Sequence, residues 1–486
     1  MTRRQIIWFI VFAFIAAICL HIELIMKGFY GISADESGRT LDALKWISSG
    51  TPISDVWLPF HRIVVGLGIS VFNDLFITPR IISFFFGLTA LTAIVWFAYE
   101  LFRDHRITCL TALLAAFFPL RVVLSVVPLS EIEFIAFIAA GFASHTRWEH
   151  SRGSLSLLAT GVFLGLSTSI RYEGWVFLIL TIMELFFERE NRKQIFHRPI
   201  IGILSLIFMN LFIAYWIYIT YADTKTLFSF INATTSNYKR VADTSFIKLI
   251  WRNPATQFFY QNVLTLNFVG IISLFRLSRS QKDIRRFVLI VLPTLAVLAF
   301  LGLIGKALPT HNPWRIPAVI SCLLIPFTAY WIVQQMERFS SLRWMRYGIP
   351  AIVLVAFAIQ VVAMTRSPVF TRSEFLIGRF VREKLIQSEL DSPKVLIETS
   401  DWSYLNIVLA SNKPDLFVYN TGFWPHNPTS PIINTHEPLS ISDLNERKIR
   451  FLVFKSKIQY NSRSNKSIQE IGHFGEWNTY EIAKIQ

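Results

Sequence analysis

The sequence predicts an α-helical membrane protein with about eleven transmembrane segments, followed by a small α/β domain. Hydrophobic residues make up 53% of the 486 positions, 44 of which are phenylalanine, and the mean hydropathy is +0.46. These values are high for a soluble domain. After Met364 the long apolar runs stop, and proline, asparagine, serine and charged residues replace them. We therefore expect a membrane domain over residues 1–364 and a separate domain over residues 365–486.

The apolar runs match the length that a helix needs to cross a bilayer, about 20 residues. The first run follows a short basic start and is expected to remain as an anchor, because no small-residue cleavage site follows it. The predicted segments are 6–26, 81–102, 107–127, 131–146, 154–170, 174–187, 198–221, 257–276, 287–304, 316–334 and 347–364.

The positive charges predict the orientation, because lysine and arginine accumulate in short cytoplasmic loops. With a cytoplasmic N-terminus, every predicted inner loop carries arginines. The odd number of crossings then places the first loop, 27–80, and residues 365–486 on the extracytoplasmic side. This distribution accounts for the net charge of +15. No free basic face with interleaved aromatic residues is visible, so we expect no nucleic-acid partner.

Two adjacent carboxylates, Asp35 and Glu36, follow shortly after the first span. Charge near hydrocarbon is costly and tends to mark a functional site, so we take Asp35 as the candidate catalytic centre, with Glu36 beside it. A structural interpretation stays open, since Ser33-x-x-Glu36 also matches a capping box at the start of a helix.

Other polar groups are expected on the same outer face, at the tips of two short hairpins. One tip carries Glu131, and the other carries Arg171 and Glu173. Polar groups at this depth are tolerated where they line a cavity or are buried in protein. The alternatives are that Glu131 stabilises the N-terminus of the following helix and that Arg171 only pairs with Glu173.

The first outer loop contains two amphipathic stretches. Residues 36–49 place Leu41, Leu44 and Ile47 at helical spacing, which suits a helix in the membrane interface. A second stretch has Pro59 at a position suited to a first helical turn and continues with His61 and Arg62.

Strand and helix patterns alternate after Met364, which predicts a small α/β domain. Helices are expected over 374–390, 402–410 and 442–448, and strands over 395–398, 416–419 and 450–455. No catalytic constellation is visible in this part of the chain.

A set of short motifs recurs in order along roughly residues 1–365: Asp35-Glu36, Leu41–Ile47, Trp57-Leu58-Pro59 with His61, Arg80, Ser130-Glu131, Arg171–Trp175 and His311–Pro317. In these motifs the chain resembles the GT-C superfamily of membrane glycosyltransferases, in the branch of the protein O-mannosyltransferases and the lipid A aminoarabinose transferases. It departs from them in having Trp314-Arg315-Ile316-Pro317 in place of an Arg-Tyr-x-x-Pro run.

The resemblance implies a sugar donor linked to polyprenyl phosphate and an extracytoplasmic carboxylate, here Asp35, as general base. The expected location is the bacterial inner membrane. Attack by a hydroxyl on an anomeric carbon also requires a carboxylate that accepts the proton. The departing phosphate requires cations. The candidates for that role are Arg171, Lys306, His311 and Arg315, followed by His61 and Arg62.

Some assignments stay open at this stage. A divalent cation between Asp35 and Glu131 is one option, but the two carboxylates lie on separate segments and give no ligand spacing to judge. The acceptor, whether protein, lipid or glycan, is not indicated. The alternatives to a glycosyltransferase are a transporter or flippase of lipid-linked sugars and another polyprenyl-phosphate-using transferase.

Overall fold

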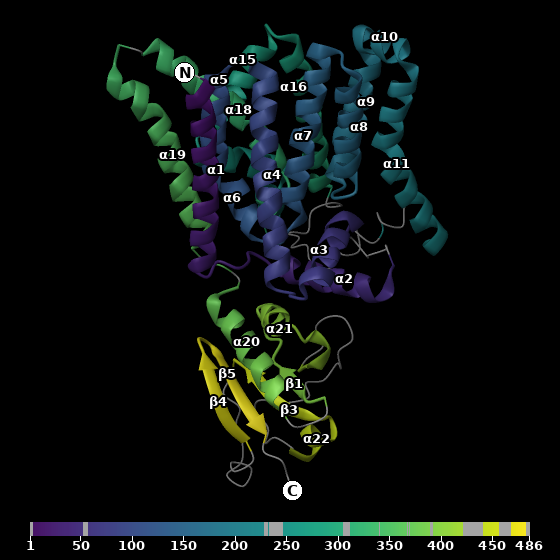
Figure 1. The fold of residues 1–486 in the computed structure, drawn as a ribbon, viewed down its shortest axis with the longest axis vertical. Coiled ribbons are helices and arrows are strands. Elements are labelled where there is room, and N and C mark those ends of the chain that lie inside the picture. The colour runs from purple at the N-terminus through teal and green to yellow at the C-terminus, as the bar shows by residue number, and fades with distance from the viewer. Residues whose placement is uncertain are drawn as a thin grey trace. The chain divides into compact units, whose positions relative to one another are not determined.

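The computed structural model describes residues 3–51, 57–227, 232, 246–304, 312–339, 341–366, 368, 370–388, 392–420, 441–455 and 468–482 (Figure 1). The chain divides into two compact units. The membrane unit consists of Met1–Leu24, Asp42–Leu67 and Arg80–Ser367. The sheet unit consists of Ile25–Leu41, Gly68–Pro79 and Pro368–Gln486.

Every segment that was predicted to cross the membrane is helical. Long helices of the membrane unit, among them α4, α7, α8 and α16, run alongside one another in Figure 1. The helices are α1 (Arg3–Met26), α2 (Asp35–Ser49), α3 (Pro59–Phe72), α4 (Ile77–Phe102), α5 (His105–Phe117), α6 (Pro119–Val126), α7 (Ser130–Ser151), α8 (Ser154–Thr168), α9 (Glu173–Phe187), α10 (Arg189–His197), α11 (Pro199–Thr224), α13 (Phe246–Arg252), α14 (Pro254–Leu264), α15 (Phe268–Ser278), α16 (Lys282–Leu303), η1 (Pro313–Arg315), α17 (Ala318–Leu323), α18 (Ile325–Arg338) and α19 (Arg343–Thr365).

The described helices confirm a polytopic membrane protein. Six helical stretches are long and apolar enough to cross a membrane, and the number rises to eight if each of two bent pairs counts as one span. The bends are 53° between α5 and α6 and 105° between α14 and α15. The second angle fits either a broken span or a re-entrant loop.

Arg121 supports the bend between α5 and α6. Its guanidinium donates to the backbone carbonyls of Ala115 and Ala116, at the end of α5, and to that of Gly87 on α4. Pro119 at the start of α6 cannot continue the hydrogen-bond ladder of α5. A break in a membrane helix needs other donors for the freed carbonyls. We therefore assign the buried Arg121 a structural role.

Buried amides hold the second bent pair. Asn262 at the end of α14 donates to the Ser321 hydroxyl, and Asn267, just before α15, donates to the Ser321 carbonyl. Thr328 on α18 donates to the Asn267 side chain at 2.6 Å. The network connects α14 and α15 to α17 and α18, and so it fixes the segment that follows Arg315.

The sheet unit contains five strands in the order β2-β1-β3-β5-β4. β1 pairs in parallel with β2 and β3, and β5 pairs antiparallel with β3 and β4. The sequence pattern predicted β1, β2 and β3 but not the β4–β5 hairpin. The elements are α20 (Arg372–Gln387), β1 (Lys394–Ile397), α21 (Tyr404–Ser411), η2 (Pro414–Leu416), β2 (Phe417–Tyr419), α22 (Ile441–Glu446), β3 (Ile449–Phe454), β4 (Ile468–Phe474) and β5 (Trp477–Ile482).

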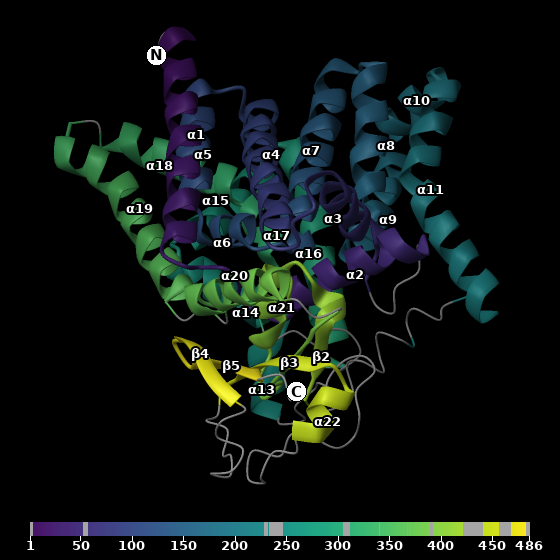
Figure 2. The same cartoon turned by 60° about the horizontal axis from the view of Figure 1, so that its bottom comes forward.

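The sheet has an apolar core on each face. Figure 2 shows α20 and α21 on one side of the strands and α22 on the other. On one face, Val395 and Val453 of the sheet pack with Ile377 of α20 and Ile407 of α21. On the other face, Leu396, Leu452 and Tyr480 pack with Leu444 of α22. Alternate residues of β1 point to opposite faces, as expected for a strand buried on both sides. The predicted small α/β domain is confirmed.

Parts of the first outer loop cluster with the sheet unit, although the sequence analysis placed the whole loop in the membrane domain. Tyr30 and Phe76 each make ring contacts with Phe375 of α20, and Gly31 forms a β-bridge with Phe370. A Cβ at Gly31 would lie 2.3 Å from the Phe370 ring, so only glycine fits there. These contacts are distant in sequence, which is why hydropathy did not reveal them.

Candidate active site

Asp35 is the first residue of α2, and the chain before it is shaped by Glu36. The Glu36 carboxylate accepts hydrogen bonds from the amides of Ile32 at 2.8 Å and Ser33 at 3.1 Å, and from the Ser33 hydroxyl at 2.6 Å. Glu36 is 1% exposed. Its carboxylate thus satisfies donors at the helix start, as the capping-box interpretation expected. We conclude that Glu36 orients this segment.

The segment that carries Asp35 is anchored in the sheet unit on both sides. Ala34 and Leu41 pack against the core formed by α20, α21 and the sheet. The Ser37 hydroxyl lies 3.4 Å from the side-chain oxygen of Asn406 on α21. The C-terminal domain therefore sets the local position of the Asp35 carboxylate.

In the membrane unit, Glu131 joins two arginines. Its Oε1 atom lies 2.6 Å from Nη1 of Arg171 and 2.6 Å from Nη2 of Arg315. Arg171 also pairs with Glu173 at 2.6 Å. The structure thus brings together four of the predicted site residues, two basic and two acidic. The Arg171–Glu173 pair that the structural interpretation expected is present, but it belongs to this larger group.

Three elements position these charges. Glu131 lies in the first turn of α7, Arg171 lies in the turn between α8 and α9, and Arg315 ends the short helix η1. Trp175 closes the α8–α9 turn by donating from its indole to the Thr168 carbonyl at 2.9 Å. Consecutive antiparallel helices bring the start of α7 and the start of α9 to the same end of the bundle.

The exposures of these side chains differ. Glu131 and Arg315 are each 3% exposed, whereas Arg171 and Glu173 are 15% and 12% exposed. A charge-assisted pair at low exposure is strong but needs all its partners, because an unpaired buried charge is costly. Arg171 is therefore the more accessible of the two arginines.

His61 belongs to a second pair at the same end of α7. Its Nδ1 atom lies 2.8 Å from Oε1 of Glu133, and both side chains are almost fully buried. The amide of Phe60 donates to the Ser169 carbonyl, which ties the start of α3 to the end of α8. Glu133 is thus the partner of a predicted site residue. The signal was its position two residues after Glu131.

The remaining predicted residues fall into two groups. Arg62 pairs with Asp42 at 3.5 Å, which connects α3 to α2 within the membrane unit. Lys306 and His311 lie outside the described residues. Two guanidinium groups already neutralise Glu131. The divalent cation that was considered between Asp35 and Glu131 stays a prediction.

Comparison with known families gives one match in the membrane unit. The family model for dolichyl-phosphate-mannose-protein mannosyltransferases matches residues 56–228. This stretch contains Glu131, Arg171 and Glu173, whereas Asp35, Glu36 and Arg315 lie outside it. A search of curated protein sequences finds no match.

Solved structures resemble nearly the whole chain. ArnT from Cupriavidus metallidurans in the apo state has a TM-score of 0.58, 11% sequence identity and 99% coverage of both chains. The same protein bound to undecaprenyl phosphate has a TM-score of 0.60, 12% identity and 100% coverage of both chains. The Archaeoglobus fulgidus oligosaccharyltransferase, in complex with Zn and sulfate, has a TM-score of 0.50 and 12% identity, covering 91% of this chain and 67% of the other.

These matches confirm the predicted resemblance to the GT-C superfamily at the level of the fold. The chain has an ArnT-like fold, with a helical membrane part and a C-terminal α/β part.

Proposed function

We propose that this chain is an integral membrane glycosyltransferase that moves a sugar from a polyprenyl-phosphate-linked donor to an acceptor on the extracytoplasmic face. The mannosyltransferase family match over residues 56–228 supports the reaction class. The ArnT-like fold supports the donor class, since the ArnT structure has undecaprenyl phosphate bound.

The observation that carries the proposal is the convergence of Arg171 and Arg315 on Glu131 at one end of the bundle. Guanidinium groups form bidentate contacts with phosphate oxygens, and such contacts stabilise the charge that develops on a departing phosphate. Glu131 would hold the two guanidiniums in place, so that little reorganisation is needed when the donor binds. A purely structural ion pair would need only one arginine.

We assign Asp35 the role of general base. In the proposed step the acceptor hydroxyl oxygen attacks the anomeric carbon and its proton passes to the Asp35 carboxylate. The bond between the anomeric carbon and the phosphate oxygen breaks, and polyprenyl phosphate leaves with the bonding electrons. Such a base must lie within hydrogen-bond reach of the hydroxyl. Glu36 would act by orienting the segment that carries Asp35.

The proposal is tested by mass spectrometry of glycolipids and surface glycans in a strain that lacks the gene. We expect one polyprenyl-phosphate sugar to accumulate and one glycoconjugate to lose that sugar. The wild-type gene and the Asp443→Asn variant, which changes an exposed carboxylate on α22, should both restore the pattern. Asp35→Asn should not.

Two results would contradict the proposal. An unchanged set of glycoconjugates in the deletion strain would show that the protein does not transfer a sugar to them. Restoration of the pattern by Asp35→Asn would show that Asp35 is not the general base. A transporter would be indicated if purified protein moved lipid-linked sugars across vesicles without cleaving them.

A further inference from the structure

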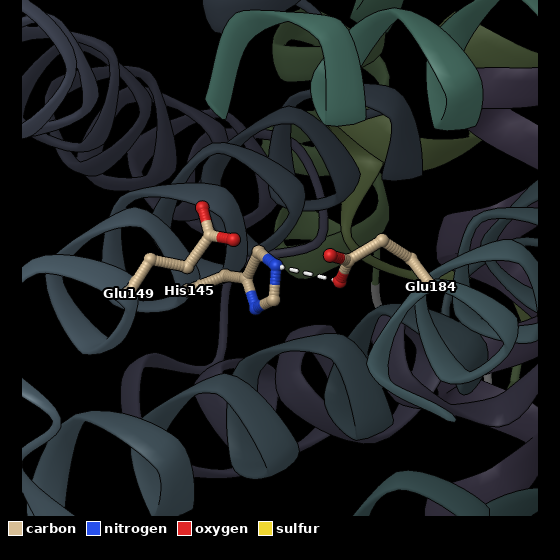
Figure 3. Close-up of side chains that lie close together, drawn as sticks. All are labelled: His145, Glu149 and Glu184. Atoms are coloured by element: carbon tan, nitrogen blue, oxygen red, sulfur yellow. Dashed lines mark ion pairs between the residues drawn. The ribbon is translucent and has the colours of Figure 1, made fainter. Parts of the chain in front are cut away.

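We propose that His145, Glu149 and Glu184 bind a divalent transition-metal ion at the end of α7 opposite Glu131. Figure 3 shows the His145 ring between the carboxyl groups of Glu149 and Glu184. One ligand atom from each residue lies within 4.8 Å of the other two. His145 and Glu149 are one helical turn apart on α7, and Glu184 comes from α9. The site is separate from the proposed catalytic residues, because 14 residues of α7 span about 21 Å.

The three side chains are buried, and His145 has a ring nitrogen available as a metal ligand. His145, Glu149 and Glu184 are 5%, 4% and 7% exposed. Among the described residues, Nδ1 of the His145 ring has no hydrogen-bond partner. Nε2 of His145 and Oε2 of Glu184 lie 3.2 Å apart, a contact that is an ion pair only while His145 is protonated. Buried polar atoms without hydrogen bonds call for an explanation, and an ion is one.

The charge of the cluster also calls for a cation. Arg286 of α16 forms ion pairs with four carboxylates: Glu149, Glu184 at 3.4 Å, Glu188 at 3.4 Å and Asp283 at 3.9 Å. Lys282 also pairs with Glu188 at 2.7 Å, and His150 lies 3.2 Å from Asp283. Arg286 is thus left to balance the two buried carboxylates, Glu149 and Glu184, and uncompensated buried charge is costly. A divalent ion bound to neutral His145 would supply the missing positive charge without displacing Arg286 from Glu149.

The donor set indicates the kind of ion. Imidazole nitrogen suits zinc and other transition metals, and carboxylate oxygens accept zinc and manganese as well. Ligand bonds to zinc are about 2.0–2.2 Å long, so the three side chains would close slightly around the ion. Glu184 is already oriented: Asn191 donates to its Oε1 at 3.0 Å, and Arg152 donates to Asn191. Such partners commonly fix the ligands of metal sites.

A bound ion would crosslink α7 to α9, next to the ion pair between Arg286 of α16 and Glu149 of α7. The sequence signal was His145-x-x-x-Glu149, which places two ligands on one face of a helix. These residues were not predicted as a site, because they lie at the end of a predicted span.

The test uses the full chain, purified in detergent with its affinity tag removed, stripped with a chelator and then equilibrated with Zn²⁺ or Mn²⁺. Elemental analysis after desalting should find about one ion per chain. His145→Asn and Glu184→Gln should lose the ion. His197→Asn and Glu190→Gln, which change exposed residues of α10, should keep it. Asn191→Ala should weaken binding by about 10- to 100-fold.

A gain of affinity provides a test that misfolding cannot imitate. Arg286→Gln removes a positive charge that would repel the ion from the neighbouring ligands, so this variant should bind the metal more tightly, by about tenfold or more. The proposal fails if the wild-type chain binds neither ion. It also fails if His145→Asn and Glu184→Gln keep the metal, or if Arg286→Gln folds and binds no more tightly than the wild type. A cluster held only by protonated His145 would give the first of these results.

Discussion

Glu131 shows how one residue can organise a site from distant parts of a chain. Its single Oε1 atom meets two guanidiniums, one of which is 184 positions away. Removing one member of a buried ionic group leaves its partners without compensation, at a cost of about 3–5 kcal/mol. The residue therefore matters for stability as well as for binding.

We expect Glu131→Gln to lower the thermal unfolding temperature and to abolish turnover, because Arg171 and Arg315 would then repel each other. Glu173→Gln is the matched control. It removes a more exposed carboxylate and leaves both arginines paired with Glu131, so its effect on unfolding should be smaller. Thermal unfolding of the two variants in the same detergent measures the difference. Equal losses would contradict the role assigned to Glu131.

We expect Glu36 to affect catalysis indirectly, by orienting the segment that carries Asp35. Glu36→Gln would keep the size of the side chain but weaken the bonds from the Ile32 and Ser33 amides, and each bond to a charged group contributes about 1.5–3 kcal/mol. We expect kcat to fall by about tenfold or more, with the KM for the donor lipid nearly unchanged. Steady-state kinetics decide the point. A rise in KM with an unchanged kcat would instead place Glu36 in donor binding.

At the scale of elements, Asp74 connects the start of α4 to α20. Its carboxylate accepts from the Phe76 and Ile77 amides and pairs with Arg379 at 2.7 Å. Burial alone would raise the pKa of Asp74, but the hydrogen bonds from Ile77, Arg379 and Phe76 and the charge of Arg379 lower it below the ordinary value.

A lowered pKa in the folded state makes this contribution depend on pH. The stabilisation should be fully present above the unfolded value, about 3.9, and should be lost as the pH falls through the lower folded pKa. We expect the unfolding temperature of the wild type to fall more steeply below about pH 4 than that of Asp74→Asn. Parallel curves for the two proteins would show that Asp74 makes no such contribution.

The elements that could be predicted from the sequence are those with a local signal. Hydropathy marked the segments that contain α1, α4 to α9, α11 and α14 to α19, but not α10 or α13. Amphipathic spacing indicated α2 and α3, and Ser33-x-x-Glu36 matched the start of α2. The β4–β5 hairpin went unpredicted, because it follows a polar stretch without a turn signal next to β3. Arg121 was missed because its acceptors are carbonyls, which no side-chain pattern reveals.

The candidate site shows the same division. The hairpin tips predicted that Glu131 and Arg171 share one face, and Arg315 was a candidate for the same phosphate as Arg171. Their meeting at a single carboxylate depends on the packing of α7, the α8–α9 turn and η1, which no local pattern encodes. The membership of residues 25–41 in the sheet unit has the same origin, since Phe370 and Phe375 lie over 300 positions later.

At the scale of the whole molecule, the proposal requires the sheet unit to be extracytoplasmic. In a variant without its three native cysteines, Asn445→Cys on α22 should react with a membrane-impermeant maleimide in intact cells. Gln194→Cys on α10 should react only after the membrane is opened. Both positions are exposed. The reverse pattern would place the C-terminal domain in the cytoplasm, where the proposed reaction could not occur.

The central claim is that Asp35 accepts the proton of the acceptor while other residues bind the donor. The direct measurement compares purified wild type, Asp35→Asn and Asp443→Asn for polyprenyl-phosphate binding, by native mass spectrometry, and for turnover of the lipid-linked sugar. We predict that Asp35→Asn binds the lipid as the wild type does and loses turnover by about 10²- to 10⁴-fold, while Asp443→Asn is unaffected. Wild-type turnover by Asp35→Asn would contradict the account.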